Sequence, residues 1–186
     1  MAGFRVALDA NVLFPIVQAD LLLHLADENA YVPLWSAEIL GELTRALIST
    51  GATSEQNALR RVAMMNEAFP DAQIHNWEGL VGGIKGIPDP DDRHVIAAAI
   101  EGNASAIVTN NLKDFPDEAL ALHGLHAKSC DDFLLDLFDL YPERFTKALE
   151  SMQAMRRNPA VTIGQLVSSL EVSCPNFVSA YRESSD

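Results

Sequence analysis

The stretch that decides the fold runs from Pro88 to Phe115 and reads PDPDDRHVIAAAIEGNASAIVTNNLKDF. Asp89 is a good helix N-cap and Pro90 suits the first helical position, so a helix is predicted from there to Gly102. The apolar run Ala104–Thr109 then gives the clearest strand in the chain. A helix that leads directly into a short apolar strand is typical of proteins with a parallel sheet.

The rest of the chain extends this alternation of strands and helices. Further strands are expected at Arg5–Leu8, Tyr31–Trp35, Gln73–Asn76 and Leu125–Lys128. Further helices are expected at Ala19–Glu28, after the N-cap residues Ser36 and Ser54, and at Asp131–Leu140, Glu143–Arg157 and Thr162–Leu170. We therefore predict a three-layer α/β/α domain with a central parallel sheet over residues 1–136, followed by a helical extension over residues 137–186.

Composition restricts the class of protein. The 186 residues are 48% hydrophobic and hold no apolar run long enough to cross a bilayer. The first residues lack the apolar segment of a signal peptide, so we expect a cytoplasmic protein without a membrane partner. Cys130 and Cys174 are too few for a disulfide framework, and we expect both to be reduced.

The net charge of −13 argues against tight, sequence-independent binding to a nucleic acid backbone. It is compatible with a nuclease if a metal ion neutralises several of the acids. The local clusters Arg60–Arg61 and Arg156–Arg157 offer positive charge for phosphates. An acidic surface also suits a basic protein partner.

Four acidic residues lie at the polar margins of apolar runs: Asp9, Glu42, Asp92 and Asp114. In a parallel α/β sheet, ligands bind beyond the carboxyl ends of the strands, where Asp9 and Asp114 are expected. Converging carboxylates repel one another, and a hard divalent cation is the usual compensation. Each acid also has a simpler explanation, as a turn residue, a solvated helix residue, a helix-dipole partner or a loop residue.

Neighbouring residues refine this candidate metal site. Asp92 is expected at the third helical position above the apolar stripe, whereas Asp89 caps the helix and Asp91 faces solvent; whether either shares the work of Asp92 stays open. Side chains expected to support the carboxylates are Asn11, Thr109 and Asn110. The five histidines form no HxxxH pair, and no glycine-rich nucleotide loop or GxSxG elbow is present.

Four segments carry a family resemblance: Leu8–Leu13, Ser36–Leu43, Asp89–Ala99 and Ile107–Phe115. Through them the chain resembles the PIN-domain ribonucleases and, within these, the VapC-type toxins of prokaryotic toxin–antitoxin pairs. The resemblance implies a metal-dependent endoribonuclease that binds RNA and a cognate antitoxin protein and that allows a homodimer. It also implies catalytic and metal-ligating roles, with Mg²⁺ or Mn²⁺ bound, for Asp9, Glu42, Asp92 and Asp114.

Two other functions stay open at this stage. One is a regulatory binding module that keeps the PIN fold without catalysis. The other is a phosphatase of the haloacid dehalogenase type, which also places an aspartate after its first strand. That family has a second aspartate two residues later, and here the position is Asn11. The helical extension from about Leu137 goes beyond a minimal PIN domain, although some longer VapC-like proteins carry such a tail.

Overall fold

The computed structural model describes residues 4–156 and 159–185. Within these residues one sheet contains five strands: β1 (Arg5–Leu8), β2 (Val32–Ser36), β3 (Gln73–Ile74), β4 (Ala106–Val108) and β5 (His126–Lys128). The strand order is β3-β2-β1-β4-β5, and every neighbouring pair is parallel. The prediction of a central parallel sheet is therefore confirmed, and each strand lies within one residue of its expected segment or inside it.

The strand order places a topological switch point beside β1. From β1 the chain adds β2 and β3 on one side, then returns to add β4 and β5 on the other. The carboxyl ends of β1 and β4 are neighbours there, and the Asp9 N–H donates to the Val108 carbonyl at 3.0 Å. In open α/β sheets the crevice at such a switch point is the usual place for a ligand.

The helices of the first half lie close to their expected positions. They are α1 (Ala10–Leu13), α2 (Ile16–Asp27), α3 (Ala37–Ser49) and α4 (Glu55–Ala68). Ser36 and Ser54 cap α3 and α4 through their side chains, as predicted. The short helix α1 was not expected, and α2 begins three residues earlier than expected because Pro15 directly precedes its first turn.

Between β3 and β5 the chain forms three 3₁₀ turns and two helices. They are η1 (Glu78–Gly83), η2 (Pro90–Asp92), α5 (Arg93–Glu101), η3 (Leu112–Asp114) and α6 (Asp117–Ala121). The helix predicted from Asp89 begins as the 3₁₀ turn η2, in which Asp89 accepts a hydrogen bond from the Asp91 N–H at 2.9 Å. Asp92 is therefore the N-cap residue of α5 and does not occupy its third position.

The C-terminal helices are α7 (Cys130–Leu140), α8 (Pro142–Met155), α9 (Ile163–Ser168) and α10 (Pro175–Ser185). The predicted helix Glu143–Arg157 corresponds to α8, and Arg157 lies outside the described residues. α10 was not expected. Cys130 and Cys174 are buried and unbridged, as predicted. No helix in the described ranges is long and apolar enough to cross a membrane.

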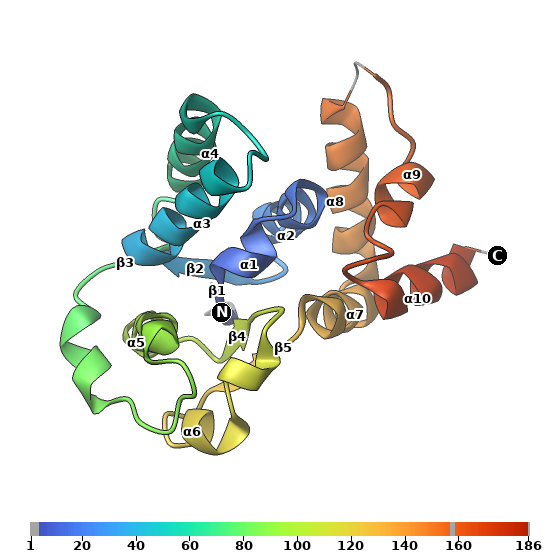
Figure 1. Cartoon of the computed structure of the whole chain (residues 1–186). Coiled ribbons are helices and arrows are strands. Elements are labelled where there is room, and N and C mark those ends of the chain that lie inside the picture. The colour runs from blue at the N-terminus through green and yellow to red at the C-terminus, as the bar shows by residue number, and fades with distance from the viewer. Residues whose placement is uncertain (1–3, 157–158, 186) are drawn as a thin grey trace.

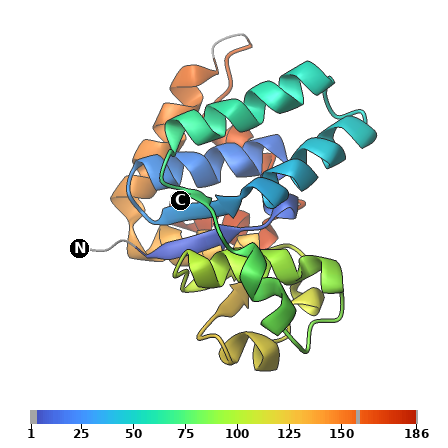
Figure 2. The ribbon, with the colours of Figure 1, turned by 90° about the vertical axis from the view of Figure 1, so that its left-hand side faces the viewer.

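The helices cover both faces of the sheet (Figure 1). α5 and α6 lie on one side, and α2, α3, α4 and the C-terminal helices lie on the other. Figure 2 shows α5 running beneath the strands, where its residues His94–Ala99 are all buried. One hydrophobic core includes residues of the sheet, of α5 and of α7–α10. The arrangement is the three-layer fold that was predicted.

Candidate active site

Asp9 lies at the end of β1, where it is 6% exposed. Its Oδ2 atom accepts hydrogen bonds from Thr109 Oγ1 at 2.7 Å and from Asn11 Nδ2 at 2.6 Å. Asn11 Nδ2 also reaches Thr109 Oγ1 at 3.0 Å. Two residues that follow β1 and β4 thus hold the Asp9 carboxylate in a fixed orientation. Asn11 does so as a donor, which an ionised aspartate at that position cannot be.

This environment changes the acidity of Asp9. Burial raises its pKa above the ordinary value, because the charged carboxylate loses hydration, and the negative charge of Glu42 raises it further. The hydrogen bonds from Thr109 and the Ala10 backbone act in the opposite direction and partly offset the rise. Burial therefore disfavours the charged form of Asp9, and the hydrogen bonds from Thr109 and Ala10 stabilise it.

Asp92 carries the clearest sign that the acids converge. Its pKa is raised to about 6, first by burial and then by the negative charges of Asp9, Asp114, Asp89 and Glu42. The acids come from four separate segments of the sequence, and all lie within electrostatic reach of Asp92. The charge of Asp89 contributes to the raised pKa of Asp92, and the Asp89 side chain also caps η2. Asp91 is exposed.

Glu42 points toward α5 from the middle of α3. Its Oε1 atom lies 3.1 Å from His94 Nε2, and its side chain is 33% exposed. Burial acts to lower the pKa of His94, but the hydrogen bond and charge of Glu42 outweigh it, so the pKa is raised. His94 was not predicted to belong to the site, because it lacks a histidine partner at helical spacing. The signal that was available is its position two residues after Asp92 on an apolar helix.

The loop after β4 holds the fourth acid. Asp114, in η3, accepts a hydrogen bond from the Asn111 side chain, and the Asn111 N–H donates to Thr109 Oγ1 at 3.0 Å. Asn110 takes part through its backbone N–H, which donates to Asn11 Oδ1 at 2.8 Å. Asn111 was missed by the sequence analysis, although its spacing of three residues before Asp114 is that of a short capped turn.

The acids are close enough to repel one another but do not form a compact ligand set. Among the residues that the structure describes, no three His, Cys, Asp or Glu side chains stand in an arrangement that would directly hold a metal ion. The available donors are carboxylate oxygens, which are the ligands of hard divalent cations. Burial and the neighbouring acids both make the charged form of Asp92 less favourable, which raises its pKa.

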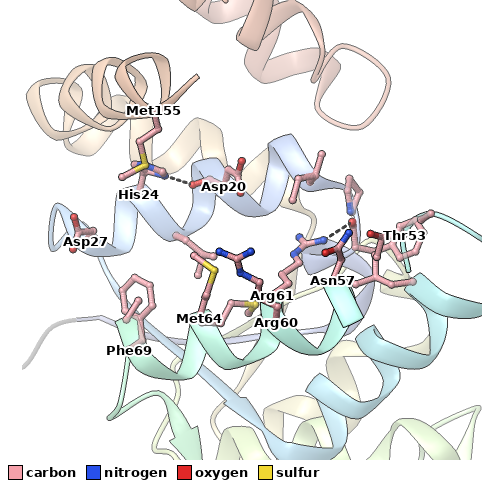
Figure 3. A pocket seen from close by; sticks show the side chains of 18 residues that line it. Asp20, His24, Asp27, Thr53, Asn57, Arg60, Arg61, Met64, Phe69 and Met155 are labelled. Carbon is pink, nitrogen blue, oxygen red and sulfur yellow. Dashed lines mark hydrogen bonds between the residues drawn. The ribbon is translucent and has the colours of Figure 1, made fainter. Parts of the chain in front are cut away.

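A separate groove of about 850 Å³ lies between α2 and α4 (Figure 3), and none of the four acids lines it. Asp20, His24 and Asp27 of α2 face Arg60, Arg61 and Met64 of α4 across it. Arg61 and Arg156, one residue from each basic cluster, make structural contacts on this side of the molecule. Arg61 donates to the carbonyls of Leu13 and Phe14, and Arg156 pairs with Asp20.

Comparisons with known proteins agree with this architecture. The sequence model of the PIN domain matches residues 5–113, and that of the VapC50 C-terminal domain matches residues 130–183. A Mycobacterium tuberculosis protein named "Putative ribonuclease VapC50" is 42% identical over 91 residues, which cover 49% of this chain and 54% of that protein. The match thus spans about half the length of the curated relative. No solved structure gave a significant match.

Proposed function

Because this chain belongs to the PIN-domain family, we propose that it is a metal-dependent endoribonuclease that hydrolyses RNA phosphodiester bonds. The single observation that supports the proposal is the cluster of acids at the switch point, where Thr109 and Asn11 orient the buried carboxylate of Asp9 at 2.7 and 2.6 Å. The nearby acids and burial raise the pKa of Asp92 to about 6. Such an unfavourable cluster at the switch point of a parallel sheet is typical of a functional site. We propose Asp9, Glu42, Asp92 and Asp114 as its catalytic acids.

Mg²⁺ or Mn²⁺ suits these acids by ligand type and charge. We propose that Asp9 and Asp92 hold the cation directly and that Asp114 and Glu42 do so directly or through water. When bound, such a cation lowers the pKa of a water molecule and neutralises charge on the phosphate in the transition state.

The protein's own residues supply the orientation. Thr109 and Asn11 both donate to one oxygen of Asp9, Oδ2, and so fix the orientation of the carboxylate. Asn111 fixes Asp114 in the same way at the far side of the loop. Carboxylates that are already oriented do not have to be reordered when the phosphodiester arrives.

The test is RNA cleavage by single-site variants. Asp9→Asn and Asp92→Asn keep the shape of each side chain and remove its charge, and we expect both to abolish cleavage and any growth arrest on expression. Asp91→Asn is the matched control, since Asp91 is exposed on the same turn. Circular dichroism shows whether each variant folds. Cleavage retained in both test variants would defeat the site assignment.

We further propose that the protein is the toxin of a toxin–antitoxin pair and that a basic antitoxin binds it. The net charge of −13 supports a partner of opposite charge. Co-expression with the product of a neighbouring short reading frame, followed by co-purification, tests this partner. We also propose a homodimer, which light scattering of the purified protein tests.

The domain organisation stays a proposal of the same kind. We propose two parts, a PIN-like part and a C-terminal helical part, with α7 as their shared element. The expected division between residues 136 and 137 falls within α7. On one side α7 packs Phe133 against Tyr31 at 5.0 Å between ring centroids, and on the other Asp131 binds the start of α10. Limited proteolysis tests whether the first cut falls beyond α7.

A further inference from the structure

His94 is a buried polar residue whose position has no explanation in packing alone. It is 8% exposed, and its Nδ1 atom is buried without a hydrogen-bond partner among the described residues. An unpaired buried nitrogen costs stability, whereas an apolar side chain of similar size would fill the same space without that cost. The contact of the other ring nitrogen, Nε2, therefore gives a better explanation for a histidine at this position.

The other nitrogen contacts Glu42. His94 Nε2 lies 3.1 Å from Glu42 Oε1, and this is the one side-chain hydrogen bond that Glu42 makes within the described ranges. Asp9 has two side-chain donors on a single oxygen, so its orientation is secured twice. Glu42 has three rotatable bonds and a side chain that is 33% exposed, so without His94 it would sample several rotamers.

His94 is itself held in place. Its ring packs beside Trp77, with 6.0 Å between ring centroids, and its backbone belongs to the first turn of α5. Asp92 lies two residues earlier, as the N-cap of the same helix. A hydrogen bond from this turn to α3 therefore fixes Glu42 relative to Asp92, although 52 residues separate Glu42 from His94.

We propose that His94 is a positioning residue that holds the Glu42 carboxylate toward the acid cluster and so prepares the site for a divalent cation. The inference rests on the proposed function, because it assigns His94 a part in the same site. His94 acts through Glu42 and touches neither the cation nor the RNA. Among the described residues Oε2 of Glu42 makes no hydrogen bond or ion pair, so in this proposal it is the oxygen that serves the cluster.

The experiment measures Mn²⁺ affinity by calorimetry and RNA cleavage on the full chain. His94→Met fills the space without a donor, and we expect it to weaken Mn²⁺ binding about tenfold, the usual effect of losing a partner that orients a ligand. His94→Gln keeps an N–H donor and should recover most of the affinity. In a Glu42→Gln background, His94→Met should have no further effect, because the two residues act as one unit.

The outcomes separate the two proposals. Equal affinity in the wild type and His94→Met, or an equal loss in both Glu42 and Glu42→Gln backgrounds, would overturn the positioning role while the proposed function stands. If His94→Met does not fold, His94→Gln decides: affinity as low as in Glu42→Gln overturns the inference. A wild type that neither binds Mn²⁺ nor cleaves RNA overturns the proposed function, and the inference with it.

Discussion

Thr109 Oγ1 donates a 2.7 Å hydrogen bond to Asp9 Oδ2, and the two residues are 100 positions apart in the sequence. They meet because β1 and β4 are parallel neighbours that end at the same edge of the sheet. The hydroxyl is buried and also accepts the Asn111 N–H at 3.0 Å, so one side chain joins the Asp9 site to the loop that carries Asp114.

Thr109→Val removes the hydroxyl while keeping the shape of the side chain. The hydrogen bond from Thr109 lowers the pKa of Asp9, so its loss raises that pKa further. We expect Mn²⁺ affinity to fall about tenfold, with a larger loss at pH 6 than at pH 8, because more Asp9 is protonated at pH 6. Calorimetry at both values checks this. Thr109→Ser keeps the donor and should bind like the wild type; equal binding by Thr109→Val would count against the link.

The raised pKa of Asp92 makes the stability of the folded protein depend on pH. Its pKa is about 6 in the folded protein and 3.8 ordinarily, so the folded state binds an extra proton between these values. Stability should therefore fall as pH rises from about 4 to 6, and the penalty is fully present above 6. We expect Asp92→Asn to be more stable than the wild type by on the order of 1 kcal/mol at pH 7 after solvent screening, and equal to it at pH 4.

Urea unfolding in the presence of a chelator measures this difference at pH 4, 5, 6 and 7. Asp91→Asn is the control, because Asp91 is exposed and its neutralisation should leave the pH dependence unchanged. The prediction fails if Asp92→Asn is less stable than the wild type at pH 7. Added Mg²⁺ should stabilise the wild type and so reduce the difference by which Asp92→Asn is the more stable protein.

Gly102 is the C-cap residue of α5 and packs closely against side chains of β2 and β3. A Cβ atom there would lie 2.8 Å from Leu34 Cδ1 and 3.1 Å from Ile74 Cδ1, so Gly102→Ala requires these side chains or the end of α5 to shift. We expect a loss of about 1–3 kcal/mol, as for other overpacked cores. Thermal unfolding measures it. Gly82→Ala, which meets no atom within 4 Å, should unfold like the wild type; a similar loss in both variants would refute the steric explanation.

Asp131 anchors the C-terminal helix α10 to α7. Its carboxylate accepts the backbone N–H groups of Asn176 at 3.1 Å and Phe177 at 2.8 Å, at the start of α10. Asp131→Ala leaves these donors unpaired, and we expect it to cost about 1–3 kcal/mol and to speed proteolysis of α10. Asp139→Asn changes an exposed acid of the same helix and should have no effect. Unchanged proteolysis of Asp131→Ala would show that apolar packing alone holds α10.

Local sequence patterns were sufficient for most elements. Ser36 and Ser54 predicted the starts of α3 and α4 because a serine before an apolar helical stripe satisfies free N–H groups in any tertiary setting. α1, α6 and α10 were missed. α1 is a single short turn directly after Asp9. α10 begins where Asp131 accepts the N–H groups of Asn176 and Phe177, which are 45 and 46 positions away. Neither cause is visible in a local window of sequence.

The sequence by itself determined the alternation of strands and helices and the four acids at the edges of apolar runs, since periodicity and capping act between near neighbours. Only the tertiary structure decided which donors serve those acids. Thr109 reaches Asp9 because β4 pairs with β1, and His94 reaches Glu42 because α5 packs beside α3. Such contacts depend on strand order and helix packing, which the burial of the whole core selects and no single segment encodes.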